Sequence, residues 1–162
     1  MKLNVGCGYD HREGYVNLDR VMIKGVNCVF DLDSGDNLPF PDNTFDEILA
    51  FHILEHITDM GFVMKELYRV LKPDGQLIIR YPYYTHPNAW FGIDHKRCLT
   101  HDVFRQFYYK APKEYYIDTP KFREFSYEYH LTGVGKLMKP FVSWMRHLCN
   151  ILILEEEVTL TK

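Results

Sequence analysis

The sequence lacks a long hydrophobic run, a paired set of cysteines and an excess of basic charge. Its longest strongly apolar stretch, residues 141–154, is interrupted by polar side chains and is shorter than the ~20 residues that a membrane-spanning helix needs. The four cysteines are scattered without a Cys-x-x-Cys pair, which argues against a cysteine-based structural zinc site. The formal net charge of -3 offers no basic surface for a phosphate backbone, so nucleic acid is a poor candidate partner.

The composition is that of a globular domain. The chain has 162 residues, of which 46% are hydrophobic and 25% are charged. Because it contains no internal repeat and no long linker, we expect a single domain over residues 1–162, with a cofactor-binding half at 1–82 and a substrate-side half at 83–162. Unpaired cysteines and the absence of a signal peptide predict a cytoplasmic protein with reduced thiols.

Short apolar runs alternate with turns and one strong helical pattern. Apolar side chains three and four residues apart predict a helix over residues 60–71, and Thr100 is the expected N-cap of a second helix that reaches Tyr109. Strands joined by crossover connections indicate an α/β fold with a mostly parallel sheet. The strands of this sheet are expected at residues 2–5, 15–18, 26–32, 45–51 and 76–81.

The last third of the chain has a weaker pattern. Residues 122–130 and 156–161 are expected to form strands, and residues 134–151 a helix that breaks near Pro140. The broad apolar face within residues 141–152 predicts burial in the core or in a homodimer interface. A helix lying on a membrane surface is the less favoured alternative.

Glycines and acidic residues occur where the first strands end. Gly6 and Gly8 follow the first strand, Asp19 ends the second and Asp31 ends the third. In an open parallel sheet, ligands bind beyond the carboxyl ends of the strands. A bare glycine backbone can approach a nucleoside closely, and a carboxylate can accept hydrogen bonds from both ribose hydroxyls. The pattern therefore predicts a nucleoside site.

The spacing of these residues argues against a dinucleotide. Asp19 comes only 11 residues after Gly8, whereas a dinucleotide fingerprint places the ribose acid about 20 residues on, after a helix that holds the pyrophosphate. Residues 9–14 are too few for such a helix. S-adenosylmethionine contains adenosine without phosphate, and its sulfonium is cationic, so the missing helix end costs it little.

Five motifs share their order and spacing with a known family. They are Gly6-Cys7-Gly8, Asp19, the segment Leu38-Pro39-Phe40-Pro41-Asp42-Asn43, Ile53-Leu54-Glu55-His56 and the segment from Glu66 to Gly75. With these motifs the chain resembles the class I S-adenosylmethionine-dependent methyltransferases over residues 3–107, and more narrowly a short subgroup like methyltransferase type 11. The resemblance implies a Rossmann-like fold, a mostly parallel twisted sheet with helices on both faces, and a truncated first crossover.

The resemblance also implies S-adenosyl-L-methionine as the cofactor and assigns residues to it. By position, Asp19 would bind the ribose hydroxyls, and Asn4 stands where the family usually has an acid that anchors the glycine turn. Tyr9 replaces the usual third glycine. The remaining implied contacts are Gly6, Cys7 and Gly8 for the methionyl part, Asp31 and Leu32 for the adenine, and Ala50, Phe51 and His52 for the far wall.

The acceptor side is expected after the fifth strand. There His95 is the best-placed general base, with Asp94 beside it and His86 as a further candidate. Alternatively, residues 94–97 anchor a lid or bind an acidic acceptor group. We predict methyl transfer to an oxygen or nitrogen of a small-molecule or saccharide-like acceptor. The alternative is a catalytically inactive nucleoside-binding or regulatory module, which the departures at Asn4 and Tyr9 favour.

Two further patterns have a simpler interpretation. His52-Ile53-Leu54-Glu55-His56 matches the His-x-x-Glu-His pattern of inverted zinc proteases, but it straddles a strand end and a helix start instead of one established helix. We interpret it as a hydrogen-bonding pair at a helix start and predict no metal; a non-protease metal site that uses Glu55 or His56 is the less favoured alternative. The aromatic side chains from Tyr83 to Phe91 would line an acceptor pocket or only pack beneath a lid.

Overall fold

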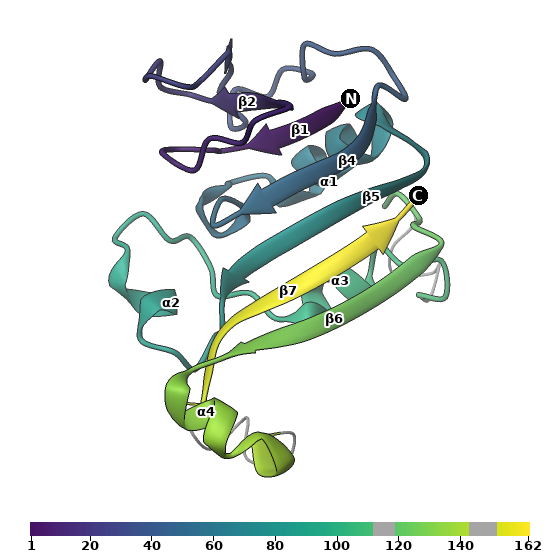
Figure 1. Cartoon of the computed structure of the whole chain (residues 1–162). Helices are drawn as coiled ribbons and strands as arrows, with labels where there is room; N and C mark the ends of the chain where they lie inside the picture. The colour runs from purple at the N-terminus through teal and green to yellow at the C-terminus, as the bar shows by residue number, and fades with distance from the viewer. Residues whose placement is uncertain (112–118, 143–151) are drawn as a thin grey trace.

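The computed structural model describes residues 1–111, 119–142 and 152–162, and a seven-stranded sheet organises them (Figure 1). The strand order is β3-β2-β1-β4-β5-β7-β6. All pairs from β3 to β5 are parallel, whereas β7 runs antiparallel between β5 and β6. The strands are β1 Lys2–Val5, β2 Tyr15–Asp19, β3 Cys28–Val29, β4 Phe45–Phe51, β5 Leu71–Pro82, β6 Glu124–Leu131 and β7 Ile153–Thr161.

The helices that cover the core lie on one face of this sheet. In Figure 1, α1 and α3 are both seen behind the strands. Leu67 of α1 and Phe104 of α3 belong to the same core cluster as the strand residues Leu3 and Ile79, and all four side chains are fully buried. The described helices are α1 Met60–Val70, α2 Asn88–Phe91, α3 His101–Arg105, α4 Gly133–Leu137 and the 3-10 turns Leu54–His56 and Lys139–Phe141.

The predicted α/β class and its mostly parallel sheet are confirmed, but the cover of the second face differs from the prediction. Loops connect β1 to β2 and β2 to β3, so the described residues place no crossover helix there. Asn4, Leu49 and Ile78 alternate with the core residues of their strands and lie outside the main core cluster. The helix-free connection between β1 and β2 corresponds to the truncated first crossover that the sequence predicts. On this face of the sheet, loops and not helices cover β2, β1 and β4.

Several element boundaries differ from the predicted ones. The third strand is reduced to Cys28–Val29, because the residues after Phe30 form a cavity wall described below. The turn expected at residues 72–75 is an irregularity inside β5, where the pairing with β4 jumps and Asp74 has a φ of 63°. α3 ends at Arg105 instead of Tyr109, and β7 already begins at Ile153.

The tail prediction can be followed only in part. β6 lies where a strand was expected, and the expected helix begins with α4 and breaks at Lys139–Phe141, next to Pro140. Residues 143–151, which carry most of the predicted apolar face, lie outside the described residues. The predicted homodimer interface and its membrane alternative therefore stay predictions.

A buried carboxylate joins β5, β7 and α3. Glu156 is fully buried, and its Oε1 lies 2.6 Å from Nδ1 of His101. Its Oε2 accepts hydrogen bonds from the Tyr81 hydroxyl at 2.9 Å and from the backbone N–H of His101 at 3.0 Å. Burial, together with the nearby Glu156 charge, raises the pKa of Tyr81. The buried carboxylate of Glu156 is tolerated because both of its oxygens have hydrogen-bonding partners.

Arg69 of α1 holds the Leu38–Asp42 turn against the helix. Its guanidinium donates to both carboxylate oxygens of Glu66, at 2.8 and 2.7 Å, and to the carbonyl oxygens of Phe40 and Leu38. It also donates to Oδ1 of Asp42 at 2.8 Å. Glu66 in turn accepts from the Leu38 N–H, and the Arg69 hydrogen bonds lower the pKa of its carboxyl group. Only a planar guanidinium can span these acceptors together.

We expect Arg69→Lys to lower the free energy of unfolding by about 2 kcal/mol, because a lysine keeps the charge but loses several of these hydrogen bonds. Urea denaturation followed by circular dichroism measures the effect. Arg123→Lys is the matched control, because Arg123 forms an exposed ion pair with Asp74. Equal stability losses in the two variants would show that the turn does not depend on Arg69.

Candidate active site

A cavity of about 550 Å³ lies at the carboxyl ends of β1, β2 and β4. Its size is in the usual range for small-molecule sites. Residues from the glycine turn, from the strand ends and from the segment after β5 meet there, although they are far apart in the sequence. The predicted site residues that line it are Gly6, Gly8, Asp19, Asp31, Leu32, His52 and Asp94.

The glycine turn after β1 requires glycine. Gly6 has a φ of 61° and Gly8 a φ of 48°, a region of backbone conformation that disfavours side chains. A Cβ at Gly6 would also lie 2.5 Å from Cγ1 of Ile53. The backbone of this turn therefore reaches the cavity wall without side chains in the way.

Asp19 fastens the glycine turn to the end of β2. Its Oδ2 accepts a hydrogen bond from the Gly8 N–H at 2.8 Å, and its Oδ1 accepts one from the Val21 N–H at 3.0 Å. Each carboxylate oxygen keeps a further lone pair that can face the cavity. Asp31 has an exposed carboxylate, whose Oδ1 accepts from the Asp33 N–H at 3.0 Å. The two acids thus differ in how firmly they are held.

Four predicted cofactor residues do not line the cavity. Cys7 is buried, and this burial raises the pKa of its thiol. Ala50 is fully buried in the core. Phe51 lies between two guanidinium groups, with its ring centroid 5.2 Å from Arg12 and 4.3 Å from Arg80. Asn4, the fourth, is buried, and its side chain donates hydrogen bonds to the loop between β1 and β2.

His52 brings a positive charge to the rim of the cavity. It follows β4 with a φ of 53°, which is uncommon for a residue with a side chain. Its Nε2 lies 3.1 Å from Oε1 of Glu155, and its Nδ1 lies 3.7 Å from Oε1 of Glu55. Hydrogen bonding to Glu155, and secondarily the longer ion pair with Glu55, raises the pKa of His52 to about 9. The imidazole is therefore mostly protonated at neutral pH.

A network of asparagines holds the loop that replaces the first crossover helix. Asn4 Nδ2 donates to the carbonyl oxygen of Asp10 at 2.7 Å and to Oδ1 of Asn17 at 3.1 Å. The same Asn17 oxygen accepts from the Arg12 N–H, and Asn17 Nδ2 donates to the Arg12 carbonyl oxygen. Asn4 and Asn17 are both buried. An acid at position 4 has no amide to donate, so asparagine suits this loop better.

We expect Asn4→Asp to destabilise the fold by roughly 1–3 kcal/mol, because a buried carboxylate would face two acceptors instead of donating to them. Thermal unfolding at neutral pH measures the loss. Asn88→Asp, at an exposed position, is the matched control. If both variants unfold at the wild-type temperature, the amide network does not support the loop.

The predicted acceptor-side residues are only partly brought together. Asp94 lines the cavity, and its Oδ2 lies 3.1 Å from Nδ1 of His56, another lining residue. His95 does not line it; its Nδ1 lies 3.0 Å from the carbonyl oxygen of Ala89. His86 is outside the cavity too, and its Nδ1 accepts from the backbone N–H of Asn88. The base role of His95 stays a prediction.

Lys96 fastens the segment after β5 to the loop after β3, and Arg97 fastens it to the turn after β4. Lys96 Nζ lies 2.6 Å from Oδ2 of Asp33, and Arg97 donates to the carbonyl oxygens of Ile57 and Thr58. These contacts favour the anchoring interpretation of residues 94–97 for the two basic side chains. The sequence analysis did not assign His56 or Ile93 to the cavity, although both line it. Because these residues lie far from the glycine turn in the sequence, no sequence pattern indicates that they reach the same cavity.

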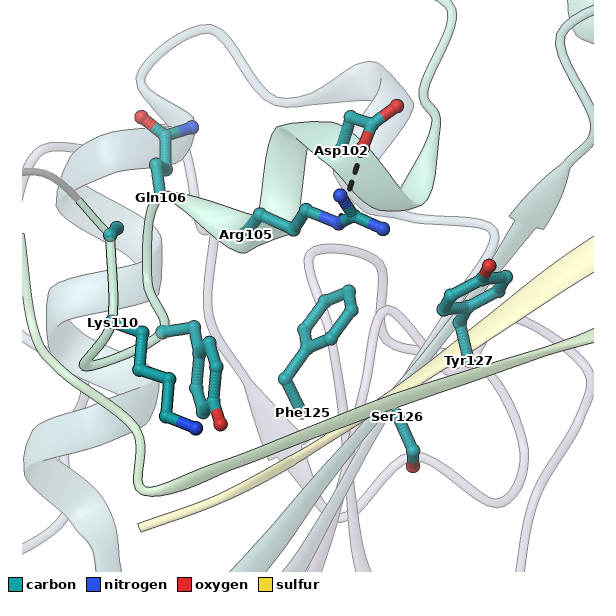
Figure 2. Close-up of a pocket in the computed structure, with 9 residues that line it drawn as sticks. Asp102, Arg105, Gln106, Lys110, Phe125, Ser126 and Tyr127 are labelled. Atoms are coloured by element: carbon teal, nitrogen blue, oxygen red, sulfur yellow. Dashed lines mark ion pairs between the residues drawn. The ribbon is translucent and has the colours of Figure 1, made fainter.

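A larger cavity, of about 720 Å³, lies between α3 and β6. Figure 2 shows Arg105 paired with Asp102 on α3, and Phe125 and Tyr127 on β6 at the other side of the cavity. None of the residues predicted to bind a cofactor or an acceptor lines this cavity. The smaller cavity is therefore the better candidate for the active site.

Among the described residues, no helix is both long and apolar enough to cross a bilayer.

Comparison with known proteins links the chain to methyltransferases. Residues 6–79 match the family described as "Methyltransferase domain". A demethylmenaquinone methyltransferase of Listeria welshimeri is 31% identical over 153 residues, which are 88% of this chain and 61% of the relative. A ubiquinone/menaquinone biosynthesis C-methyltransferase of Cellvibrio japonicus is 39% identical over 66 residues, 40% of this chain and 26% of that protein. The chain thus spans less than two thirds of the length of these relatives.

Solved structures share the fold. A methyltransferase from Archaeoglobus fulgidus, described as dependent on S-adenosylmethionine, matches with a TM-score of 0.68 and 15% identity, over 99% of this chain and 85% of its own. Phosphoethanolamine N-methyltransferase 2 of Haemonchus contortus, solved with S-adenosyl-L-methionine, matches with a TM-score of 0.61 and 14% identity, over 99% of this chain and 48% of its own. At such low identity, these matches confirm the Rossmann-like architecture alone.

Proposed function

Because the chain belongs to the class I S-adenosylmethionine-dependent methyltransferase family, we propose that it transfers the methyl group of S-adenosylmethionine to a small-molecule acceptor. The observation that carries this proposal is the junction of Asp19 with the glycine turn. There a carboxylate and a bare backbone line the same cavity at the carboxyl ends of β1 and β2.

The residues around the cavity fit the cofactor. Asp19 has acceptor lone pairs for ribose hydroxyls, and the turn of Gly6 and Gly8 leaves room for the methionyl part. Leu32 offers an apolar wall and Asp31 an exposed acceptor for the adenine. When bound, the cofactor supplies a methyl group that is already activated by its positive sulfur. The protein therefore has to orient the acceptor and exclude water more than to activate the methyl group.

Asp94 and His56 are the titratable pair on the acceptor side of the cavity. Their side chains lie 3.1 Å apart, and both line it. Of the two, Asp94 is positioned to accept a proton if the acceptor has to lose one. Ile93 lines the cavity beside them with an apolar side chain. This apolar surface supports an acceptor with an apolar part.

The atom that receives the methyl group is the finer part of the proposal. The sequence predicts an oxygen or nitrogen of a small-molecule or saccharide-like acceptor, whereas the relatives named above include C-methyltransferases of quinone biosynthesis. Incubation with methyl-labelled S-adenosylmethionine and panels of hydroxyl, amine and quinol acceptors decides among them by mass spectrometry of the product. Cofactor binding without transfer to any of the acceptors would favour the alternative of an inactive binding module.

We expect Asp19→Asn to weaken S-adenosylmethionine binding at least tenfold, because it removes charge-assisted hydrogen bonds to the ribose worth roughly 1.5–3 kcal/mol each. Isothermal titration calorimetry measures the change. Asp31→Asn is the matched control and should cost less, because its carboxylate is exposed. A larger loss in Asp31→Asn than in Asp19→Asn, with both variants folded, would reverse the assignment of the two acids.

A further inference from the structure

Glu55 is a buried acid whose carboxylate lacks a hydrogen bond. It lies in the 3-10 turn Leu54–His56 after β4, and only 2% of its surface is exposed. Neither of its carboxylate oxygens has a hydrogen-bond partner among the residues that the structure describes. The nearest ion-pair partner, Nδ1 of His52, is 3.7 Å away and faces Glu155 more closely. His52 therefore offers this carboxylate only a long ion pair, and a buried carboxylate without a hydrogen bond is stabilised further by a closer cation.

Two imidazoles lie beside this carboxylate. One ligand atom from each of Glu55, His56 and His95 can be chosen so that all three lie within 4.8 Å of one another. The rings of His56 and His95 meet edge to face, with their centroids 4.7 Å apart. His56 Nδ1 is buried and makes no hydrogen bond, although Asp94 Oδ2 lies 3.1 Å from it. The cluster therefore combines one carboxylate and two nitrogen donors.

His95 is oriented as metal-binding histidines usually are. Its Nδ1 lies 3.0 Å from the carbonyl oxygen of Ala89, and a donated hydrogen bond there leaves Nε2 as the free ligand atom. Gly92 allows this placement, since a Cβ at that position would lie 2.6 Å from Cδ2 and 2.9 Å from Nε2 of the His95 ring. Gly92 has a φ of -75°, so close approach and not backbone conformation is the reason for glycine here.

We propose that Glu55, His56 and His95 bind a divalent transition-metal ion of the Zn²⁺ type at the wall of the cofactor cavity. Two imidazoles and one carboxylate are a donor set that Zn²⁺ uses in sites with an open coordination position. His56 also lines the cavity, so the proposed metal site borders it. The His-x-x-Glu-His pattern alone does not predict this site, because its third ligand comes from the segment after β5.

A second cluster in the described part of the chain, formed by Glu128, His130 and Glu157, serves as the comparison. The Glu128 side chain is 70% exposed, and Glu157 already pairs with Arg80 at 2.7 Å. Exposed and paired carboxylates have no need of a metal ion. The two clusters therefore predict different responses to the same ion.

The test uses the whole chain, treated with a chelator, dialysed and titrated with Zn²⁺ in a calorimeter. We expect one ion to bind per chain, and Glu55→Gln and His95→Gln each to weaken binding roughly ten- to hundredfold. His130→Gln, the matched control, should bind Zn²⁺ as the wild type does. Absence of binding to the wild type, unchanged binding in both ligand variants, or loss of binding in His130→Gln would overturn the proposal.

Gly92→Ala tests the site with all three ligands in place, so it does not depend on how the ligand variants fold. The added methyl group should push the His95 ring aside and weaken Zn²⁺ binding at least tenfold. Gly133→Ala is its control, because a Cβ there meets no atom within 4 Å. Wild-type affinity in Gly92→Ala would overturn the assignment of His95. None of these measurements requires methyl transfer, so they stand apart from the test of the proposed function.

Discussion

Everything in the candidate site depends on the parallel pairing of β1 with β2 on one side and β4 on the other. Val5 is in register with Leu18 of β2 and with Ala50 of β4, so the three strands end at the same level. The glycine turn, Asp19 and His52 are therefore brought to one edge of the sheet, although they belong to separate parts of the sequence. Since all three strands must end together, a shift in any one register would separate the groups that line the cavity.

The parts of the site that follow directly after a strand could be predicted from the sequence. Short apolar runs indicate buried strands. In a parallel sheet, the residues that directly follow each strand lie at the ligand-binding edge. This is why Gly6, Gly8, Asp19 and Asp31 could be assigned to a cavity that the structure contains. Ala50 and Phe51 were also predicted to line this cavity but do not, since a position at the end of a strand does not determine which face of the sheet the side chain occupies.

The groups that a long connection delivers could not be predicted in this way. His95 reaches Glu55 and His56 only because α2, Gly92 and the Arg97 hydrogen bonds fold the segment after β5 back over the turn after β4. The hydrophobic periodicity of the sequence does not predict such a contact, because the contact depends on packing between segments and not on local conformation. The irregularity inside β5 is similar: its proline and glycine favour a turn, yet β4 pairs with β5 at Leu71 before it and again from Gln76 after it.

Charge explains why the cavity suits a nucleoside with a positive sulfur better than a dinucleotide. Lys96 is already paired with Asp33, and His52 with Glu155, so neither cation is left to hold a pyrophosphate. The loop fixed by Asn4 replaces the helix whose N-terminus would do so. Arg20 then faces a cavity that Asp19, Asp31 and Asp94 also line. A phosphorylated ligand would meet more negative than positive charge there, whereas a cationic methyl donor or a divalent ion would be attracted by the same carboxylates.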